Sequence, residues 1–356
     1  MDAEERAVRI ARNTEEVLTP EELTSLLERR ARPRAYIGFE PSGLLTVGHL
    51  VCLRKMRDLA EAGVELTVFL ADWHAWINDK LGGDRARIDA AGRYMREAFV
   101  ALGLDEATTR WRWAHELVAR SEYWDRVVRI AKGTSLARTK RAMTVLGRSE
   151  EEASLDTAKL FYPAMQSADI FELPVDIALA GLDQRRAHVL AREAAHSNGW
   201  PVPVAVHTPL ISSLKGGGRM EASGGAPERK MSKSDPTSAI VLPSSPEVIE
   251  ARIRGAFCPA REVDGNPVVE IARYLILPAQ GRLAIPREGR FGGPLEIASA
   301  EELLALWRAG GLHPQDLKGA VGAALAELCA PVAEHFRRHP ATLEQLRGPE
   351  APAAQA

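Results

Sequence analysis

The sequence has few cysteines and no marked excess of either charge, and both absences narrow the classes of protein to which it can belong. Only three cysteines occur, Cys52, Cys258 and Cys329, and no CxxC pair is present. This usage argues against a disulfide framework or a zinc site and is typical of the reducing cytoplasm. The formal net charge is -2, so the whole chain carries no positive excess that would indicate nucleic acid. Binding of RNA would need only a local basic face.

Long apolar runs are also absent. The first residues, MDAEERAVRIARN, are charged and contain no apolar core of a secretory signal. No apolar run approaches the roughly 20 residues that a membrane-spanning helix needs. The apolar fraction of 46% and the charged fraction of 26% are ordinary for globular proteins, and 356 residues suffice for two domains. We therefore expect a cytoplasmic protein with no membrane partner.

The first third of the chain alternates helix and strand signals. Residues 4–31 have helical spacing, with Thr19-Pro20-Glu21-Glu22 as a helix start. Residues 35–39 (AYIGF) predict a buried strand, residues 48–62 a helix, and residues 64–71 a second strand. Strand, helix and strand in this order predict a βαβ unit, and therefore a parallel sheet with helices on both faces.

Ligands of such sheets bind at the carboxyl ends of the strands. Pro41-Ser42-Gly43 follows the first predicted strand and Asp72-Trp73-His74 follows the second, so both segments are placed at that edge. Residues 84–150 predict a helical middle, and residues 174–206 return to mixed character. Residues 213–229 are rich in Gly and Ser and predict a flexible loop, and helical patterns resume from about residue 245.

One stretch of the βαβ unit has the chemistry of a phosphate site. Gly38-Phe39-Glu40-Pro41-Ser42-Gly43 leads to Val47-Gly48-His49-Leu50 at the start of the predicted helix. Unpaired backbone N–H groups at a helix N-terminus attract anions. Gly48 would let a nucleotide approach the backbone, and His49 could donate a hydrogen bond to a phosphoryl group. The alternative is that Gly48 eases helix packing and His49 is an ordinary surface histidine.

A second stretch, far downstream, has complementary chemistry. Lys230-Met231-Ser232-Lys233-Ser234 follows the Gly/Ser-rich segment. Two ammonium groups on a flexible loop could close over a triphosphate and stabilise a pyrophosphate leaving group, chiefly in the transition state. The alternative is a solvated basic loop, which is common. Both stretches in one chain, in this order, favour the functional interpretation.

Together these stretches resemble the HIGH motif and the KMSKS loop of class I aminoacyl-tRNA synthetases. Further stretches narrow the resemblance to tyrosyl-tRNA synthetases of the archaeal and eukaryotic type. They are Tyr36–Gly43, Phe161–Ile170, Asp183–His188, Phe291–Gly293 and Leu312–Lys318. The resemblance is collinear from about residue 30 to residue 335, which is nearly the whole chain.

The resemblance implies an α/β fold, with a Rossmann-type class I catalytic domain and a C-terminal α-helical anticodon-binding domain. The implied boundaries are a helical segment at 1–30, the catalytic domain at 31–242, the anticodon-binding domain at 243–340 and a tail at 341–356. A helical insertion at about 110–150 is the expected interface of a homodimer.

The resemblance also implies an amino-acid pocket. Tyr36 and Asp169 would hold the phenol of the substrate, which has one proton to donate and lone pairs to fill. Tyr162, Gln166 and Gln184 would hold its ammonium group. The spacing of Tyr162, Gln166 and Asp169 independently predicts one helix face, although a polar face in water is the alternative. Such a pocket should reject phenylalanine, because Tyr36 and Asp169 would be left unpaired.

The remaining site residues also follow from the resemblance. The catalytic residues would be His49, Lys230 and Lys233, with a weaker expectation for Thr46. ATP would be bound by Gly38, Glu40, Ser42, Gly48, His49, Met231 and Ser232. The first base pair of the acceptor stem would be read by Arg141 and Arg185, and the anticodon guanine by Phe291, His313 and Asp316. A solvated face for the arginines, and a core position for Phe291, are the alternatives.

The sequence departs from the family pattern at four positions. Thr46 stands where the HIGH motif usually begins with His, and Lys233 stands where archaeal and eukaryotic relatives often have Ser. We hypothesise a compensating exchange in which Lys233 supplies the phosphate charge that Thr46 does not. Phe69 and Trp73 stand where smaller apolar residues are common, and they either narrow the pocket or repack its wall.

The implied activity is a tyrosine–tRNA ligase. It would activate L-tyrosine with ATP and Mg²⁺, release pyrophosphate and transfer tyrosine to the 3′ end of tRNA(Tyr), with no metal ligands of its own, no zinc and no prosthetic group. One alternative is a paralogue that activates a tyrosine analogue or another aromatic amino acid. Another, suggested only by Thr46, is a tRNA-binding relative without catalysis.

Overall fold

The computed structural model describes residues 1–143, 156–173, 175–216, 231, 235 and 237–348. The chain forms two compact units. Unit 1 comprises Met1–Gly43, Lys55–Arg96 and Leu104–Pro209, and unit 2 comprises Leu44–Arg54, Glu97–Gly103 and Leu210–Ala356. The functional domain boundaries at 30, 242 and 340 remain predictions.

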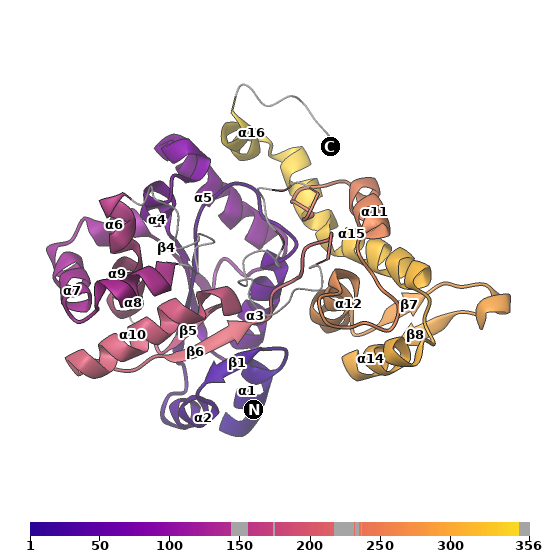
Figure 1. The fold of residues 1–356 in the computed structure, drawn as a ribbon, viewed down its shortest axis with the longest axis horizontal. Coiled ribbons are helices and arrows are strands. Elements are labelled where there is room, and N and C mark those ends of the chain that lie inside the picture. The colour runs from indigo at the N-terminus through magenta and orange to yellow at the C-terminus, as the bar shows by residue number, and fades with distance from the viewer. Residues whose placement is uncertain (144–155, 174, 217–230, 232–234, 236, 349–356) are drawn as a thin grey trace. The chain divides into compact units, whose positions relative to one another are not determined.

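A six-stranded sheet forms the centre of unit 1 (Figure 1). Its strands are β1 (Glu16–Leu18), β2 (Arg34–Phe39), β3 (Glu65–Leu70), β4 (Thr109–Trp113), β5 (Ile177–Gly181) and β6 (Val204–Thr208). Their order across the sheet is β1-β6-β5-β2-β3-β4, and every pair is parallel except β1 with β6. The prediction of a parallel sheet, with strands at 35–39 and 64–71, is therefore confirmed.

The sheet has a topological switch point at β2. From β2 the chain proceeds to β3 and β4 on one side, whereas β5 and β6 lie on the other side. The loops that leave neighbouring strands on either side of such a point separate and open a crevice at their carboxyl ends. The turn after β2 contains Gly43, whose φ of +111° is costly for a residue with a Cβ.

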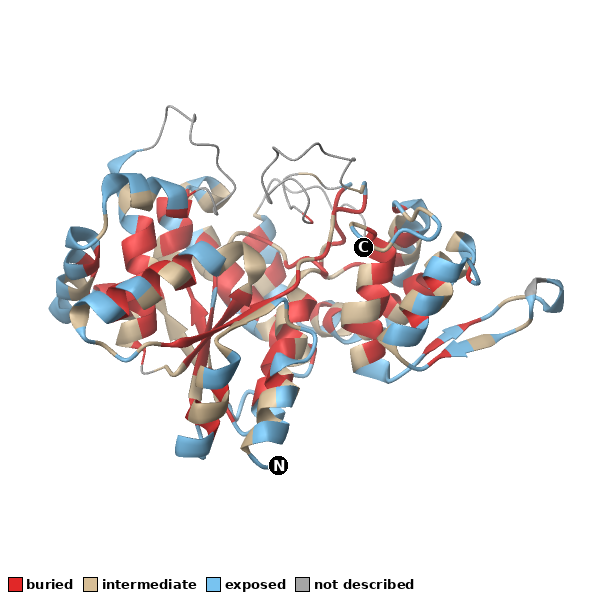
Figure 2. Cartoon of the chain, turned by 60° about the horizontal axis from the view of Figure 1, so that its bottom comes forward, coloured by how far each residue is buried: buried red, intermediate tan, exposed pale blue. Residues whose placement is uncertain are grey.

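Helices cover both faces of this sheet (Figure 1). They are α1 (Ala3–Ala11), α2 (Pro20–Arg29), α3 (His49–Glu61), α4 (Asp72–Ile77), α5 (Arg85–Ala101), α6 (Ala114–Val118), α7 (Ser121–Lys132), α8 (Leu136–Met143), α9 (Thr157–Glu172) and α10 (Arg185–Asn198). Figure 2 shows buried residues along the strands and on the inner sides of these helices. The apolar core therefore lies between the sheet and its two helical layers.

The start of α2 is set by local sequence. Thr19 accepts a hydrogen bond from the backbone N–H of Glu22 at 3.2 Å, and the Glu22 carboxylate accepts from the N–H of Thr19 at 2.9 Å. This reciprocal capping box, followed by Pro20, satisfies donors that a helix start otherwise leaves unpaired. The predicted helix start is confirmed.

Two strands of the sheet were not predicted. Residues 4–31 are not continuously helical, because β1 separates α1 from α2, and β4 interrupts the predicted helical middle. β1 has only three residues, and its pairing with β6 involves residues about 190 positions away, such as Glu16 with His207. Such a strand is formed by its distant partner and not by local propensity. The alternating aromatic pattern TRWRW of β4 was a usable strand signal.

Unit 2 is mainly helical, as predicted from about residue 245. Its helices are α11 (Pro246–Gly255), α12 (Pro267–Ile271), α13 (Leu277–Gln280), α14 (Ala300–Ala309), α15 (Pro314–Arg338) and α16 (Ala341–Arg347). The hairpin of β7 (Leu283–Ile285) and β8 (Leu295–Ile297) was missed. The first residues of the predicted tail at 341–356 form α16, which buries Leu343 and Leu346. Residues 349–356 lie outside the described residues.

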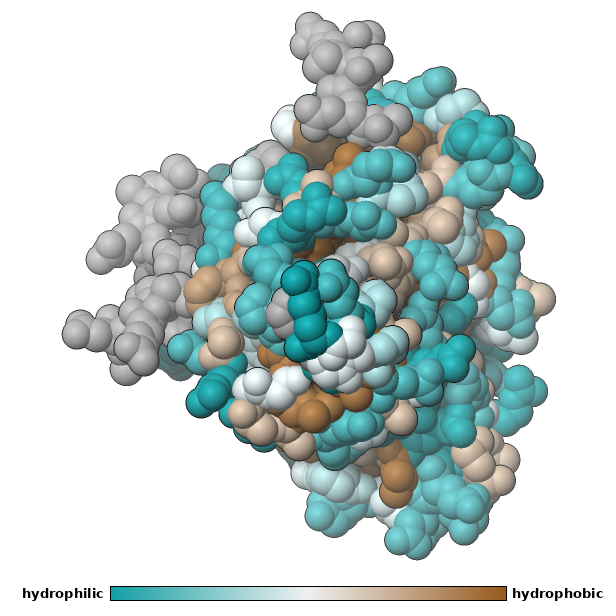
Figure 3. Space-filling model, turned by 90° about the vertical axis from the view of Figure 1, so that its right-hand side faces the viewer, coloured by the Kyte–Doolittle hydropathy of each residue, from teal (hydrophilic) through white to brown (hydrophobic). Residues whose placement is uncertain are grey.

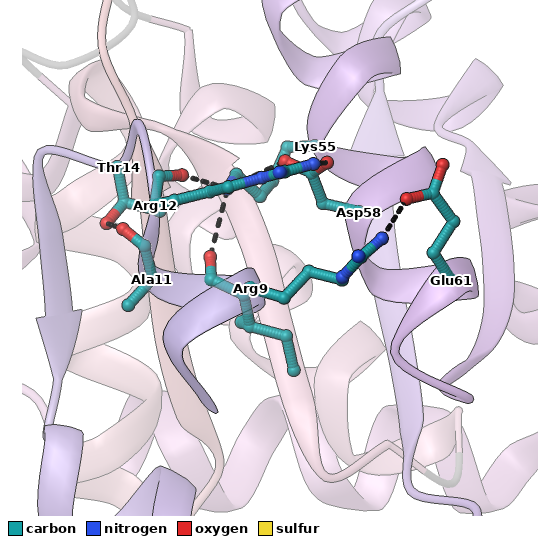
Figure 4. Close-up of polar contacts among 8 residues, drawn as sticks. Arg9, Ala11, Arg12, Thr14, Lys55, Asp58 and Glu61 are labelled. Atoms are coloured by element: carbon teal, nitrogen blue, oxygen red, sulfur yellow. Dashed lines mark hydrogen bonds and ion pairs between the residues drawn. The ribbon is translucent and has the colours of Figure 1, made fainter. Parts of the chain in front are cut away.

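A buried ion-pair cluster fastens the N-terminal segment to α3 within unit 1 (Figure 4). The Lys55 ammonium group donates to the carbonyl of Ile10 at 2.9 Å and to the carbonyl of Arg12, and it lies 3.2 Å from the Asp58 carboxylate. Arg12 donates to the other Asp58 oxygen at 2.5 Å. Lys55 and Asp58 are only 2% and 1% exposed, so the Lys55 charge is compensated by Asp58 and the Asp58 charge by Lys55 and Arg12.

Polar residues dominate the surface that Figure 3 shows, where hydrophobic residues occur in small, separate patches. Among the described residues, no helix combines the length and the apolar character needed to cross a membrane.

Candidate active site

The two residues predicted to hold a phenol lie in the buried core of unit 1. Tyr36 is on β2 and Asp169 is on α9, and they are 3% and 1% exposed. The Asp169 carboxylate is close enough to Tyr36 to add to the effect of burial in raising the pKa of that phenol. Tyr36 therefore remains a neutral O–H donor at physiological pH.

Two further side chains contact the Asp169 carboxylate, one at each of its oxygens. The Tyr123 hydroxyl, on α7, donates to Oδ1 of Asp169 at 3.0 Å. Nε2 of His74, on α4, lies 3.2 Å from Oδ2. Burial, together with the nearby Asp169 carboxylate, raises the pKa of Tyr123 well above that of a free phenol. Asp169 is thus a fixed hydrogen-bond acceptor among neutral phenols.

The charge state of His74 depends mainly on Asp169. Burial disfavours its imidazolium form, but the Asp169 carboxylate, with smaller contributions from Glu40 and Asp72, outweighs burial and raises the pKa of His74. The ion pair with Asp169 lacks hydrogen-bond angles, so within the described chain neither ring nitrogen of His74 has a hydrogen-bond partner. Unsatisfied buried nitrogens beside a carboxylate are typical of a polar binding site.

The residues predicted to hold an ammonium group are also brought together. Tyr162, Gln166 and Asp169 lie on α9 at the predicted spacing, and Nε2 of Gln166 donates to Oε1 of Gln184 at 3.0 Å. The Tyr162 hydroxyl lies 3.5 Å from the Glu40 carboxylate. Burial, followed by the Glu40 charge, raises the pKa of Tyr162. Amide oxygens and a neutral hydroxyl beside a carboxylate can accept from a cation.

Glu40, predicted to bind ATP, has partners of its own in unit 1. Its carboxylate accepts from Nδ2 of Asn78 at 2.7 Å and lies 3.5 Å from Nζ of Lys80. These contacts follow β2 and α4 at the carboxyl edge of the sheet, where the sequence placed the site. Ser42 lies in the same turn and is half-buried.

Aromatic rings close the wall beside Tyr36. The Phe69 ring lies 6.2 Å from that of Tyr36 and 6.3 Å from that of His74, between centroids. A Cβ added to Gly38 would lie 3.4 Å from the Tyr36 hydroxyl and 3.8 Å from Phe69. Phe69 is therefore part of the wall, and Gly38 borders the phenol of Tyr36. Trp73 is only partly buried and packs on the outside of this cluster.

The HIGH-like stretch and the segment after the KMSKS-like stretch pair with each other in unit 2. The N–H of Val47 donates to the carbonyl of Ile240 at 2.9 Å, and Leu242 donates to Leu45 at 2.9 Å. Thr46 and Val241 form an antiparallel bridge. The HIGH-like stretch is thus connected by backbone hydrogen bonds to a segment almost 200 residues downstream.

Thr46 directly contacts the His49 ring. The backbone N–H of Thr46 donates to Nδ1 of His49 at 3.1 Å, and the Thr46 hydroxyl lies 3.0 Å from the same atom. Since Nδ1 accepts, the neutral ring carries its proton on Nε2, which is then a donor. A Cβ added to Gly48 would lie 3.5 Å from the Thr46 hydroxyl, which is an ordinary van der Waals contact, so this contact does not by itself require glycine.

The KMSKS-like stretch lies mostly outside the described residues. Lys230, Ser232 and Lys233 belong to that undescribed part, as does most of the Gly/Ser-rich segment predicted to be flexible. Met231 is buried, and its N–H donates to the carbonyl of Ile211 at 3.1 Å. This contact fixes one point of the stretch in unit 2.

The residues predicted to contact tRNA fall in both units. Arg141 and Arg185 are exposed, on α8 and at the start of α10. His313 caps α15, where its Nδ1 accepts from the N–H of Gln315 at 3.2 Å, and Asp316 lies in the first turn of the same helix. Phe291 ends a short 3₁₀ turn (Gly289–Phe291) between β7 and β8.

Arg185 is tied to a buried histidine pair through Glu16. Its Nε and Nη2 donate to the Glu16 carboxylate at 2.8 and 2.9 Å. Glu16 also lies 3.0 Å from Nδ1 of His207, whose Nε2 lies 3.0 Å from Nδ1 of His188. Burial lowers the pKa of His188 to about 3, and burial also lowers the pKa of His207 despite the Glu16 carboxylate. Both rings are therefore neutral at pH 7.

Acid should destabilise the fold through His188. Its pKa is about 3 when folded, whereas an unfolded histidine has a pKa of about 6.5. Between these values the unfolded chain binds one more proton, so the free energy of unfolding should fall by about 1.4 kcal/mol per pH unit as the pH drops below about 6.5. Urea titrations across this range should show a shallower slope, by about one proton, for His188→Gln. Equal slopes for both proteins would contradict this account.

Sequence reasoning missed three side chains of these networks. His74 follows β3, and its segment was placed at the sheet edge without a role, so a signal existed. Tyr123 reaches Asp169 from a helix 46 residues upstream, and Glu16 reaches His207 from β1. The local sequence does not distinguish Tyr123 or Glu16, because the partners of these residues come close only in the folded chain.

The chain is similar to known proteins over nearly its whole length. A sequence profile of the family described as tRNA synthetases class I (W and Y) matches residues 28–330. A tyrosine–tRNA ligase of Aeropyrum pernix is 49% identical over 357 residues, which is 98% of both sequences. The crystal structure of tyrosyl-tRNA synthetase from the same organism has a TM-score of 0.87 at 45% identity over 98% of each chain. That of the Pyrococcus horikoshii enzyme complexed with L-tyrosine has a TM-score of 0.89 at 40% identity, covering 98% of this chain and all of the other.

Proposed function

The chain belongs to the class I tRNA synthetases of the tryptophan and tyrosine family, and from this premise we propose that it is a tyrosine–tRNA ligase. The fold implied by the resemblance, a Rossmann-type catalytic region followed by a helical C-terminal region, is that of the family. One observation of the site supports tyrosine as the amino-acid substrate. The buried Asp169 carboxylate accepts a hydrogen bond from Tyr123 and lies near Tyr36, and both phenols stay neutral.

The reaction has two steps. The tyrosine carboxylate attacks the α-phosphorus of ATP, tyrosyl-adenylate forms and pyrophosphate leaves. A hydroxyl of the tRNA 3′ end then attacks the acyl carbon, and AMP leaves. The enzyme needs no nucleophile of its own, so positioning and charge stabilisation supply the catalysis. Mg²⁺ enters with ATP, held mainly by the phosphates, and among the described residues no cluster of metal-binding side chains occurs.

Tyr36 and Asp169 orient the substrate phenol, and Tyr162, Gln166 and Gln184 receive its ammonium group. The hydrogen bond between the two glutamine amides supports this assignment, because it holds acceptor atoms together beside Tyr162. Phenylalanine would leave the Asp169 acceptor and the Tyr36 donor unpaired, which costs more than the lost contact.

ATP handling is assigned to both motifs. His49, oriented by Thr46, presents its Nε2–H to the phosphates, and Lys230 and Lys233 neutralise the departing pyrophosphate. Gly38, Glu40, Ser42, Gly48, Met231 and Ser232 complete the nucleotide contacts. The hydrogen bonds between residues 45–47 and 240–242 support this proposal, since they connect the HIGH-like stretch to the segment that follows the KMSKS-like stretch.

Contacts to tRNA are assigned to both units. Arg141 and Arg185 read the first base pair of the acceptor stem, and Phe291, His313 and Asp316 read the anticodon guanine. The exposure of His313 at the N-terminus of α15, one turn from Asp316, supports the second assignment. A carboxylate can accept from the Watson–Crick edge of guanine.

The enzyme acts in the cytoplasm as a homodimer, with its interface in the helices that follow β4. Large apolar side chains are exposed on this part of unit 1. Val128 on α7 is 51% exposed, Leu136 on α8 is 58% exposed, and Phe161 on α9 is 46% exposed. Exposed apolar residues on neighbouring helices are typical of a protein–protein interface.

Amino-acid-dependent exchange of pyrophosphate into ATP tests this function. Tyrosine should support exchange, and tRNA(Tyr) should then accept labelled tyrosine. Exchange with a substituted tyrosine but not with tyrosine would identify a paralogue with another substrate, and Phe69 in the wall is the residue that such a result would implicate. Binding of tRNA without any exchange would identify a relative that has lost catalysis.

Lys233→Ala should separate catalysis from binding. If Lys233 stabilises pyrophosphate chiefly in the transition state, the variant should lose about 100-fold in kcat of exchange with little change in KM for tyrosine. The measurement is steady-state exchange over a range of tyrosine concentrations. Unchanged exchange would show that Lys233 does not compensate for Thr46.

A further inference from the structure

The guanidinium of Arg185 is held in one orientation by Glu16. Nε of Arg185 lies 2.8 Å from Oε2 of Glu16, and Nη2 lies 2.9 Å from Oε1. This side-on pair uses two donors of the guanidinium fork, and it fixes the plane of the group. Arg185 is otherwise an exposed side chain at the first turn of α10, with 47% of its side chain accessible.

Glu16 is in turn fixed from the buried side. An ionised carboxylate only accepts hydrogen bonds, so Nδ1 of His207 must donate to Glu16. The neutral His207 ring then has an unprotonated Nε2, so Nδ1 of His188 must donate to it. Donation therefore converges on Glu16: His188 donates to His207, His207 donates to Glu16, and Arg185 also donates to Glu16. The two rings are stacked, with centroids 5.1 Å apart.

The backbone fixes Glu16 as well. Glu16 is opposite His207 in the antiparallel pairing of β1 with β6, and the N–H of Glu15 donates to the carbonyl of His207 at 2.8 Å. The three residues of β1 therefore place one carboxylate beside the first turn of α10. The unpredicted strand β1 therefore positions the carboxylate that contacts Arg185.

The ion pair leaves part of the guanidinium available. Arginine has five N–H donors, and Glu16 takes one from Nε and one from Nη2. Five minus two leaves three, including both donors of Nη1, and no other contact engages them among the described residues. Two donors on neighbouring nitrogens can pair with guanine O6 and N7 or with phosphate oxygens.

We propose that Glu16 is a positioning residue for tRNA, which holds the Arg185 guanidinium with its outer edge turned toward the acceptor stem. This inference rests on the proposed role of Arg185 in reading that stem. A guanidinium already fixed in its bound orientation loses less rotamer freedom on binding. Glu16 also keeps its own charge paired, so it does not repel the RNA backbone.

The test compares two activities of the same protein. Glu16→Gln should raise KM for tRNA in tyrosylation by about 3–10-fold, because one immobilised side chain must now be ordered on binding. Tyrosine-dependent pyrophosphate exchange should stay within about twofold of wild type, since it involves no tRNA. Asp89→Asn, which breaks the exposed pair between Asp89 and Arg93 on α5, is the matched control and should change neither activity.

A double-mutant cycle with Arg185→Ala shows whether Glu16 acts through Arg185. Arg185→Ala should raise KM for tRNA by more than Glu16→Gln, and the double variant should be no worse than Arg185→Ala alone. Additive effects, or an equal loss of pyrophosphate exchange, would overturn the inference in favour of a general structural role. Tighter tRNA binding by Glu16→Gln would also overturn it, because Glu16 would then compete with the RNA.

Failure of the underlying assignment would look different. If Arg185→Ala charges tRNA with an unchanged KM, then Arg185 does not read the acceptor stem, and the role of Glu16 falls with it. If Arg185→Ala is impaired while Glu16→Gln is normal, the assignment of Arg185 stands and only the positioning role is wrong.

Discussion

Asp169→Asn is expected to lower kcat/KM for tyrosine in pyrophosphate exchange by about 100-fold, the upper end of what a lost hydrogen bond to a buried charged group costs. The asparagine keeps the shape of the carboxylate but presents an N–H₂ group where an acceptor is needed. It would also face the Tyr123 hydroxyl, which donates to Asp169 at 3.0 Å. The His74 ring would lose the carboxylate that raises its pKa.

The same change should weaken discrimination against phenylalanine. Tyrosyl-tRNA synthetases are the measured example of a site that rejects a substrate lacking one hydroxyl, by about 10⁵-fold. Much of this rejection comes from buried groups left unpaired. With the Asp169 carboxylate removed, the ratio of kcat/KM for tyrosine to kcat/KM for phenylalanine should decrease, because kcat/KM falls more for tyrosine than for phenylalanine.

Tyr123→Phe provides a graded comparison for this experiment. It removes one donor to Asp169 but keeps the ring and the carboxylate, so a loss of only about 3–10-fold is expected. Thermal unfolding of both variants checks that the pocket still folds. Wild-type kcat/KM for tyrosine in Asp169→Asn would show that the phenol is not held at this carboxylate.

Lys55→Met is expected to lower the free energy of unfolding by about 3–5 kcal/mol, the range for breaking a buried ion pair on one side. The ammonium group of Lys55 contacts Asp58 and two carbonyls of the N-terminal segment (Figure 4), and Asp58 is 1% exposed. Methionine fills similar volume, so the loss would report the charge and hydrogen bonds and not a cavity. Urea unfolding measures it.

Two further variants test whether the loss of stability is specific to the buried pair of Lys55 and Asp58. Arg337→Met removes an exposed ion pair with Glu334 on α15 and should cost no more than about 1 kcal/mol. Lys55→Met combined with Asp58→Leu should recover part of the loss, because it removes the buried Asp58 carboxylate, whose remaining ion pair is the one with Arg12. A stability of Lys55→Met equal to that of Arg337→Met would show that the cluster contributes little.

The motifs of this chain could be interpreted without a structure because the relevant physics is local. The capping box at Thr19, the strands at 35–39 and 64–71, and the spacing of Tyr162, Gln166 and Asp169 depend on residues close in sequence. Such patterns reflect helix caps, the periodicity of apolar residues and helix geometry, and all three can be recognised in the sequence itself.

Contacts between distant residues could not be read in this way. β1 exists because β6 pairs with it, and its three residues carry no strand signal. Asp169 was assigned to the phenol by resemblance, but its contacts with Tyr123 and His74 come from α7 and α4. Pairing of residues 45–47 with 240–242 likewise joins segments that no local rule connects.

The sequence by itself determined the family and the parallel sheet, because the order of the motifs and the periodicity of apolar residues can be recognised from the sequence alone. The residues of the amino-acid pocket came from the resemblance and remain predictions. Only the tertiary structure decided which groups hold Asp169, which proton state His188 and His207 adopt, and what fixes Arg185. Those properties depend on burial and on hydrogen bonds between segments far apart in the chain, and both arise only when the chain has folded.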